Sequence, residues 1–273
     1  MPNRTADVFS GWVRAESGAD GFATNLLNNP THVNFAYEEG QVLNTTIGAI
    51  TIHMEKGTGT ANSNAIITGM YTKENGEETE AFVATIDNSG KWNCQMYESF
   101  HEIDANNKET AFALKFVTED GDGDIAHVNA VLGTNAAEML MGGGYDDVLH
   151  AGDGNDIMVY DANDAMIDGG SGIDVLLVNS ENDLDSLFSA NNIRGVEMII
   201  GATAKDTIEM LENLTNMDAL REKLGVSEMS ENAFEQSANW ELTIETSVAH
   251  TYTNHDLGVT VAIKQIQGDQ GDA

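Results

Sequence analysis

The sequence predicts a mainly β protein, in which an N-terminal β-sandwich precedes a parallel β coil that is closed by a cap of helix and strands. Three observations support this fold class. Short segments of alternating apolar and polar residues come first, a nine-residue period follows, and a helical apolar pattern precedes the last strands. We expect a linker or the end of a preceding segment at 1–29, the sandwich at 30–132, the coil at 133–180 and the cap at 181–273.

The sandwich prediction depends on about seven strand-like segments in which apolar residues recur at every second position. Turn-forming residues separate the segments, and DNSG at 87–90 is typical of a hairpin turn. Several short strands with turn signals between them favour two packed sheets. The predicted strands are His32 to Tyr37, Val42 to Met54, Asn64 to Tyr71, Glu80 to Ile86, Lys91 to Phe100, Thr110 to Thr118 and Ile125 to Leu132.

Large apolar side chains on these strands are the predicted core of the sandwich. An aromatic platform for sugars is the alternative for Trp12 or Trp92, but an aromatic ring in a strand is more often buried. We therefore expect burial. The predicted core residues are Trp92, Tyr97, Phe100, Phe112, Leu114 and Phe116.

Residues 133–177 form five consecutive nonapeptides, GTNAAEMLM, GGGYDDVLH, AGDGNDIMV, YDANDAMID and GGSGIDVLL. Gly, Asp and Asn gather in the first six positions, so a glycine-rich acidic turn precedes a short apolar strand each time. A single turn of this kind is usually an ordinary solvent-exposed turn, whereas five in register indicate a repeated structure. The eighth position is apolar in all five: Leu140, Leu149, Met158, Ile167 and Leu176.

The turns offer only oxygen ligands, because glycines expose backbone carbonyls and the sixth position supplies carboxylates. Oxygen ligands without sulfur or imidazole suit a hard cation, and Ca²⁺ accepts more protein oxygens than Mg²⁺, which keeps its waters. The sequence therefore predicts Ca²⁺ as the cofactor. The candidate ligands in the repeats are Asn135, Glu138, Gly142, Gly144, Asp147, Asp153, Asp156, Asp161, Asp164, Gly169, Ser171 and Asp174.

These repeats resemble the calcium-binding nonapeptides of the RTX family. The resemblance implies a β-roll in which two nonapeptides make one coil, so that Glu138, Asp156 and Asp174 align along one edge. The other edge pairs Asp147 with the fourth repeat, where Ala165 replaces the aspartate and Asp161 or Asp164 are the alternative ligands. We expect the edge with the three aligned carboxylates to hold calcium more firmly.

A further acidic loop, with Asp120, Asp122 and Asp124 alternating with glycine, separates the last two predicted strands. It resembles the start of an EF-hand, but Ile125 and Val131 occupy the positions where that motif needs Gly and Glu. A calcium-binding strand loop and a solvated acidic turn are the remaining alternatives. The loop and its surroundings, residues 30–132, resemble the Ig-like repeats of large RTX adhesins.

The segment DGGSGIDVLLVNSENDLDSLFSANNIRGVEMIIGATAKDTI at 168–208 resembles the part that closes the roll in type I secretion target domains. DTIEMLENLTNMDALREKLG predicts one helix that ends at Gly225 and packs one apolar face on the roll or the final strands; a coiled-coil partner surface is the alternative. We expect a strand from Asn192 to Ile199, and strands near Trp240 to Thr246 and Val259 to Ile266. Core residues expected near the first are Val196, Met198 and Ile200.

Composition indicates the compartment and excludes some partners. The net charge of −33 argues against nucleic acid and anionic membranes, and at low calcium this self-repulsion favours a loose chain. The single cysteine, Cys94, allows no disulfide within the chain, and no segment is apolar enough to be a secretory signal or a transmembrane helix. The resemblance implies an uncleaved C-terminal export signal read by the type I secretion machinery, and a location outside the cell or on the bacterial surface.

Catalysis is not expected. His101-Glu102 continues as IDA rather than as a zinc-protease motif, and Ser171 lies in GGSGI without the closing glycine of a hydrolase elbow. We expect a monomeric fragment of a longer chain that serves as the calcium-dependent folding, secretion and adhesion module of an RTX adhesin, with an unidentified surface ligand. The alternatives are the secretion tail of an RTX enzyme with an upstream catalytic domain, and a separate calcium-dependent module that binds carbohydrate or ice.

Overall fold

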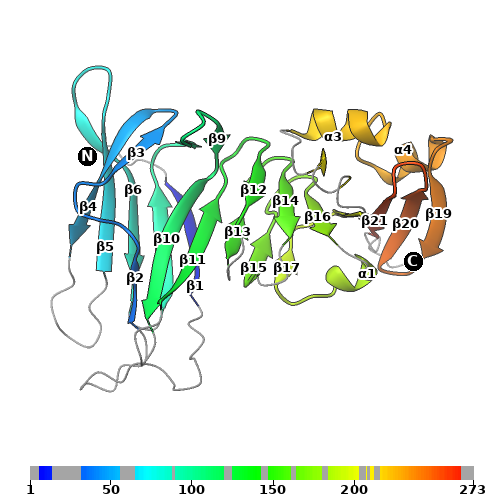
Figure 1. The fold of residues 1–273 in the computed structure, drawn as a ribbon, viewed down its shortest axis with the longest axis horizontal. Coiled ribbons are helices and arrows are strands. Elements are labelled where there is room, and N and C mark those ends of the chain that lie inside the picture. Colours follow the sequence, from blue (N-terminus) through cyan, green and yellow to red (C-terminus); the bar gives the residue numbers. More distant parts are fainter. Residues whose placement is uncertain are drawn as a thin grey trace, which may run out of the picture. The chain divides into compact units, whose positions relative to one another are not determined.

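The structure is a computed structural model, and it describes residues 6–13, 32–55, 65–87, 90–119, 125–142, 147–160, 164–179, 184–202, 207, 210–211 and 216–265. Strands dominate this part of the chain, as predicted (Figure 1). The chain divides into two compact units. Unit 1 is Met1–Leu132 with Gly142–Val148, and unit 2 is Gly133–Met141 with Leu149–Ala273.

Unit 1 contains two sets of antiparallel strands. In the first, the sheet order is β1-β7-β6-β5-β4-β3-β8-β9, and in the second β11, β10 and β2 are neighbours in this order. The first set is β1 (Asp7–Trp12), β3 (Val42–Thr45), β4 (Gly48–Glu55), β5 (Ala65–Thr72), β6 (Glu78–Ile86), β7 (Lys91–Met96), β8 (Glu102–Ile103) and β9 (Glu109–Thr110). The second is β2 (His32–Phe35), β10 (Phe112–Glu119) and β11 (Ile125–Leu132).

Aromatic rings from both sets form the core of unit 1. Phe82 on β6 lies 4.8 Å from Phe112 on β10 between ring centroids, and Trp92 on β7 lies 5.8 Å from Phe116 on β10. These contacts place the two sets of strands face to face. The burial expected for Trp92, Phe100, Phe112, Leu114 and Phe116 is confirmed.

Two aromatic residues of unit 1 are less buried than expected. Tyr97 is only half-buried, and its hydroxyl donates a hydrogen bond to Gln95 Oε1. Trp12 is 53% exposed, because it lies on β1 at an edge of the sheet, with the ammonium of Lys91 6.0 Å from its ring. Alternation along a strand does not distinguish an edge strand from a central one.

The largest differences between the predicted and the observed strands of unit 1 occur at three places. The predicted strand Val42 to Met54 is two strands, because the chain turns back between Thr45 and Gly48, where Gly48 has a φ of 111°. The predicted strand Lys91 to Phe100 ends at Met96. Part of the expected linker at 1–29 is strand β1, which pairs with β7.

Unit 2 contains a mixed sheet with the order β12-β14-β16-β18-β21-β20-β19. The first four strands are parallel, follow the acidic turns and are called the repeat sheet: β12 (Met139–Met141), β14 (Ile157–Tyr160), β16 (Val175–Asn179) and β18 (Met198–Ala202). The last three are antiparallel: β19 (Glu241–Glu245), β20 (Ala249–Asn254) and β21 (Val259–Lys264). Register places the fully buried side chains of Leu140, Met158, Leu176 and Ile199 in one row.

Shorter strands alternate along the chain with those of the repeat sheet. They are β13 (Val148–His150), β15 (Met166–Asp168) and β17 (Ile193–Arg194), and β15 and β17 are parallel. The backbone N–H of Ala151 donates to Asp168 O at 2.8 Å, which joins successive coils. The predicted strand Asn192 to Ile199 is interrupted between β17 and β18, where Gly195 has a φ of 62°. Val196, Met198 and Ile200 are buried as predicted.

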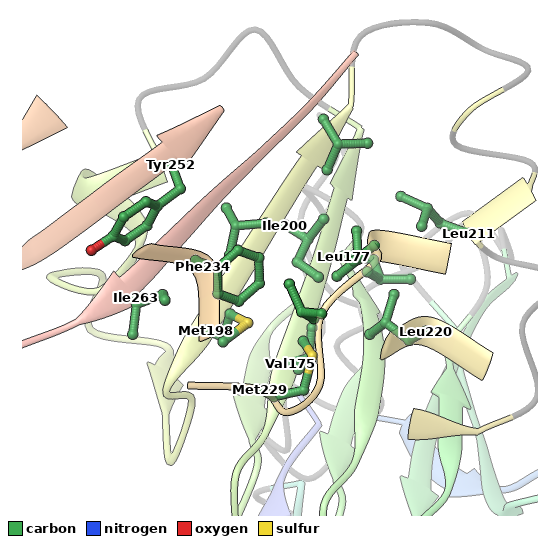
Figure 2. Packing of buried hydrophobic residues seen from close by; sticks show 14 of the residues in the cluster. Val175, Leu177, Met198, Ile200, Leu211, Leu220, Met229, Phe234, Tyr252 and Ile263 are labelled. Atoms are coloured by element: carbon green, nitrogen blue, oxygen red, sulfur yellow. The ribbon is translucent and has the colours of Figure 1, made fainter. Parts of the chain in front are cut away.

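The second face of the repeat sheet is covered by a hydrophobic cluster. Val175, Leu177, Met198 and Ile200 contribute from the sheet, and Figure 2 shows them together with side chains from the helical segments and from β20 and β21. Leu220 and Phe234 are fully buried in this cluster. The expected one-sided packing of the helix is therefore confirmed. The helices with described bounds are α1 (Leu184–Leu187), α3 (Met217–Leu224) and α4 (Glu231–Gln236).

The predicted helix after residue 205 is interrupted at Asn216. Its backbone is extended (φ −165°, ψ 168°), and its side chain accepts a hydrogen bond from the N–H of Ala219, so a new helix begins at Met217. An asparagine side chain that caps a helix offers the backbone an alternative to continuing one. Gly225, with a φ of 69°, ends α3 as predicted. No helix in the described part of the chain is long and apolar enough to cross a membrane.

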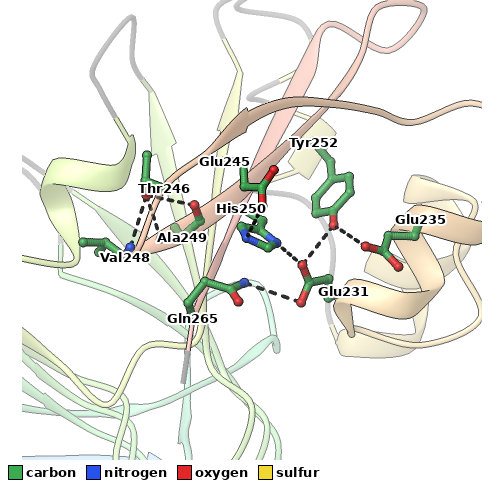
Figure 3. A network of polar contacts seen from close by, with 9 residues as sticks. All are labelled: Glu231, Glu235, Glu245, Thr246, Val248, Ala249, His250, Tyr252 and Gln265. Carbon is green, nitrogen blue, oxygen red and sulfur yellow. Dashed lines mark hydrogen bonds and ion pairs between the residues drawn. The ribbon is translucent and has the colours of Figure 1, made fainter. Parts of the chain in front are cut away.

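A polar network attaches α4 to β20 (Figure 3). The Glu231 carboxylate contacts Nδ1 of His250, and it accepts hydrogen bonds from Tyr252 Oη at 3.1 Å and Gln265 Nε2 at 3.4 Å. Burial acts to raise the pKa of Glu231, but these partners hold it below its usual range. The network therefore fixes α4 on β20.

Leu220→Ala should destabilise unit 2, because it removes a fully buried side chain from the cluster. We expect a loss of about 2–5 kcal/mol in the free energy of unfolding, measured by urea denaturation in calcium. Leu242→Ala on β19 is the matched control, since Leu242 is 44% exposed; its cost should stay within about 0.5 kcal/mol. Equal losses in both variants would contradict the described packing.

Candidate metal centre

Acidic side chains form a hydrogen-bonded ladder at the N-terminal ends of the strands of the repeat sheet. Each aspartate carboxylate in it accepts a hydrogen bond from the backbone of the preceding coil. The backbone N–H of Glu138 donates to Asp156 Oδ1 at 2.7 Å, and the N–H of Asp156 donates to Asp174 Oδ1 at 2.9 Å. Each pair is separated by 18 residues, which is two nonapeptides. The structure thus brings together the three carboxylates that the sequence places on one edge.

The two aspartates in this ladder each keep one unsatisfied oxygen. Asp156 and Asp174 have no exposed surface, and their Oδ2 atoms have no hydrogen-bond partner among the described residues. Burying a charged oxygen without a partner is costly unless a cation or a proton satisfies it. These two oxygens therefore fit a bound cation.

Burial and neighbouring charge raise the pKa of both aspartates. The pKa of Asp156 is raised to about 8, mainly by burial and further by the charges of Asp174 and Glu138, against the lowering effect of the Glu138 N–H. The pKa of Asp174 is raised to about 7, mainly by burial and further by Glu197 and Asp168, against the N–H of Asp156. A calcium ion would replace the protons that these carboxyls otherwise retain.

Glycines with positive φ allow the turns to stack closely. Gly152 and Gly154 have φ of 99° and 132°, and Gly170 and Gly172 have φ of 86° and 146°. A Cβ on Gly170 would lie 1.9 Å from Gly152 O, and one on Gly172 would lie 1.5 Å from Gly154 O. Only glycine fits at these positions. The backbone carbonyls of one turn therefore lie directly against the next turn.

The first turn of this edge differs from the later ones. Thr134 donates its backbone N–H to Glu138 Oε2 at 2.7 Å, and its hydroxyl donates to Glu138 Oε1. Both carboxylate oxygens of Glu138 thus accept hydrogen bonds within their own turn. The cation-binding potential of the ladder is concentrated at Asp156 and Asp174.

Asp147 and Asp164, the carboxylates that the sequence places on the other edge of the coil, lie in different units. In unit 1, Asp147 is fully buried and its Oδ1 accepts a hydrogen bond from the N–H of Asn129 at 2.8 Å, while Asn129 Nδ2 donates to Gly142 O at 3.4 Å. In unit 2, Asp164 is buried and its backbone carbonyl accepts a hydrogen bond from Asn192 Nδ2. Asn129 precedes Asp147 by the same 18 residues, so β11 already follows the repeat period.

The remaining predicted ligands fall into two groups. The side chains of Asn135, Asp153 and Ser171 are exposed, so these residues can offer only backbone oxygens to the interior, whereas Gly169 is buried. Asp153 and Ser171 form a parallel bridge between their turns. The other predicted ligands lie outside the described residues: Gly144, Asp161, Asp120, Asp122 and Asp124.

An ion-pair cluster that the sequence analysis missed joins the strands β13, β15 and β17 of successive coils. Asp168 Oδ2 lies 2.7 Å from Arg194 Nη2 and 3.4 Å from Nδ1 of the buried His150. Burial acts to raise the pKa of Asp168, but His150 and Arg194 hold it below its usual range. His150 and Asp168 are the ninth residues of their nonapeptides, and this 18-residue spacing is the signal that could have identified the pair.

The donor set is one of backbone and carboxylate oxygens. Within the described ranges, no group of three or more His, Cys, Asp or Glu side chains gathers around one point. Calcium fits, because it accepts backbone carbonyls and water beside one or two carboxylates.

Comparison with protein families matches residues 132–167 to the RTX calcium-binding nonapeptide repeat (4 copies). Comparisons with curated proteins and with solved structures found no match. The chain therefore carries RTX-type repeats, and Ca²⁺ is the ion for which such repeats are built, as predicted. Asp156 lies within the matched residues, whereas Asp174 lies beyond them.

The raised pKa values predict that the calcium-free chain loses stability as pH rises. Between the unfolded value of 3.8 and the folded value of about 8, the folded state holds a proton on Asp156 that the unfolded state releases. Stability falls with pH wherever the folded state binds more protons. We expect a lower melting temperature at about pH 9 than at about pH 5. Asp156→Asn should reduce this difference, and an unchanged difference would contradict the assignment.

Gly170→Ala should open the stacked turns, because its Cβ would meet Gly152 O at 1.9 Å. Gly258→Ala is the matched control, since Gly258 also has a positive φ (66°) but no atom near the added Cβ. The control should lose about 1–2 kcal/mol from backbone strain alone. Gly170→Ala should lose more and should also bind calcium more weakly by calorimetry. Equal losses would show that the stacking distance is not limiting.

Proposed function

We propose that this chain is the calcium-dependent folding, secretion and cell-surface adhesion module of a large RTX adhesin, without catalytic activity of its own. One observation carries the proposal: Asp156 and Asp174 each bury a carboxylate oxygen that has no hydrogen-bond partner in the described part of the chain. Asp156 lies within the residues that match the RTX repeat, and Asp174 lies in the nonapeptide that follows them. Without a cation, burying these carboxyl groups lowers stability, because each must either keep a proton or remain a charge without a partner.

In this proposal, calcium couples folding to the compartment. At low cytosolic calcium, the carboxylates of the ladder and the net charge of −33 oppose compaction, so the chain stays open for export. Outside the cell, calcium binds only the folded arrangement of turns and stabilises it by mass action. The parallel strands form an RTX β-roll, and the C-terminal helices and antiparallel strands form its cap.

The adhesin assignment is supported by unit 1. Its facing antiparallel strands and buried aromatic core suit an Ig-like extender, and such a domain can present a ligand-binding surface or act as a spacer. The location would be extracellular or on the bacterial surface, and the partners would be the type I secretion machinery during export and a surface ligand afterwards.

Calcium should raise the melting temperature and the strand content of the wild-type chain relative to chelator, measured by circular dichroism. The double variant Asp156→Ala with Asp174→Ala should lose most of this response, because it removes both buried oxygens. Its calcium-dependent binding to cell surfaces should fall in parallel. The double variant is designed to leave the turn glycines and their carbonyls in place.

Asp218→Ala is the control for this experiment, since Asp218 is exposed on α3 and pairs only with Arg221 in the described contacts. It should respond to calcium as the wild type does. A wild-type chain with the same spectrum and melting temperature in chelator and in calcium would refute the proposal.

A further inference from the structure

The carboxylate ladder continues beyond the nonapeptides. The backbone N–H of Asp174 donates to Glu197 Oε2 at 3.0 Å, as the N–H of Asp156 does to Asp174. Val175 pairs with Met198, so Glu197 precedes β18 as Asp174 precedes β16. The separation is 23 residues instead of 18, which is why the nine-residue period does not reveal this step.

Gly195 takes the place of the first residue of a nonapeptide. A Cβ on Gly169 would lie 2.0 Å from Gly195 O and 2.8 Å from Asp174 Oδ2. The first coil shows the same arrangement, because a Cβ on Gly133 would lie 2.0 Å from Ala151 O and 2.6 Å from Glu138 Oε2. A carbonyl oxygen of the following coil and a carboxylate oxygen thus meet beside each of these glycines.

The Asp174 oxygen at this position is the one without a partner. Oδ1 of Asp174 accepts the hydrogen bond from the N–H of Asp156 in the preceding turn. Oδ2 of Asp174 is fully buried and accepts no hydrogen bond from a described residue. Like Gly195 O, it lies beside Gly169. Arg194, the basic residue next to Gly195, is directed to Asp168 at 2.7 Å. It therefore does not supply the missing positive charge through its described contacts.

We propose that residues 195–197 complete a terminal Ca²⁺ site with the turn at 169–174, beyond the residues that match the RTX repeat. Its protein ligands are the carboxylates of Asp174 and Glu197 and the carbonyl of Gly195. The inference rests on the proposed calcium-dependent folding and adds to it a site outside the repeats.

The chemistry of this terminal site differs from that of the inner turns. The turn at 195–197 is shorter than the turn at 169–174 and offers fewer carbonyls, and Glu197 is only half-buried. A calcium ion there keeps more water ligands and is held less firmly. The longer Glu side chain reaches across the shortened turn where the inner turns use Asp. The terminal site should therefore fill last as calcium is raised.

Glu197→Gln separates a ligand from a structural contact, because the Gln carbonyl can still accept the hydrogen bond from Asp174 N–H. Bound calcium is counted by equilibrium dialysis of the full chain across a calcium titration. The variant should lose the weakest wild-type site or bind it about 10-fold more weakly. Its melting temperature in chelator should match that of the wild type. Glu222→Gln, the same change on an exposed residue of α3, should bind as the wild type does.

Glu197→Asp is the second variant, because it keeps the charge on a shorter side chain. The affinity of the weakest site should fall in the order wild type, Glu197→Asp, Glu197→Gln. Equal calcium binding by all three chains overturns the terminal site while leaving the proposed function intact. Absence of calcium binding by the wild type overturns the proposed function and the site together.

Discussion

Asp156 and Asp174 are buried in a row of acidic side chains, and the described residues around them satisfy only one oxygen of each carboxylate. Their Oδ1 atoms are held by backbone N–H groups, whereas their Oδ2 atoms have no protein partner in the described chain. The glycine turns bring the coils so close that carbonyl oxygens of one turn meet the next. Oxygen is thus concentrated where the described residues supply no protein cation, and in the proposed function calcium stabilises the repeat sheet at this point.

The cap makes this dependence a property of the whole of unit 2. Val175 and Leu177 alternate with the inward-facing Leu176, and their side chains pack against α3, α4 and the last strands. Strand β16 is therefore buried on both faces of the repeat sheet. A change in the position of β16 beside Asp174 must also shift the hydrophobic cluster, because protein interiors are close-packed.

The nine-residue period correctly predicts the ladder within the nonapeptides, which end at residue 177. Glu138, Asp156 and Asp174 align because the interval between them is constant, and a constant interval is visible in a sequence. Glu197 was missed because its turn is shortened and the preceding loop is lengthened, so that only pairing in three dimensions reveals its register. The helix break at Asn216 had a local signal, since asparagine is a common N-cap, but the apolar spacing on both sides favoured one continuous helix. The exposure of Trp12 had no local signal, because edge and centre of a sheet are decided by partners far away in the sequence.

The pairing of β18 with β21 ends the row of parallel strands in the repeat sheet. β21 is antiparallel to β18 and occupies the edge that another parallel coil would need. At the opposite end, β12 has no such antiparallel partner among the described strands of the mixed sheet. The hydrophobic cluster beneath the C-terminal elements also includes Ile157 of β14, and Met139 of β12 and Val159 of β14 pack against it, so the coils before β16 contribute to the same core. The parallel array is therefore closed at β18, and the coils before it share one hydrophobic core with the segment that closes it.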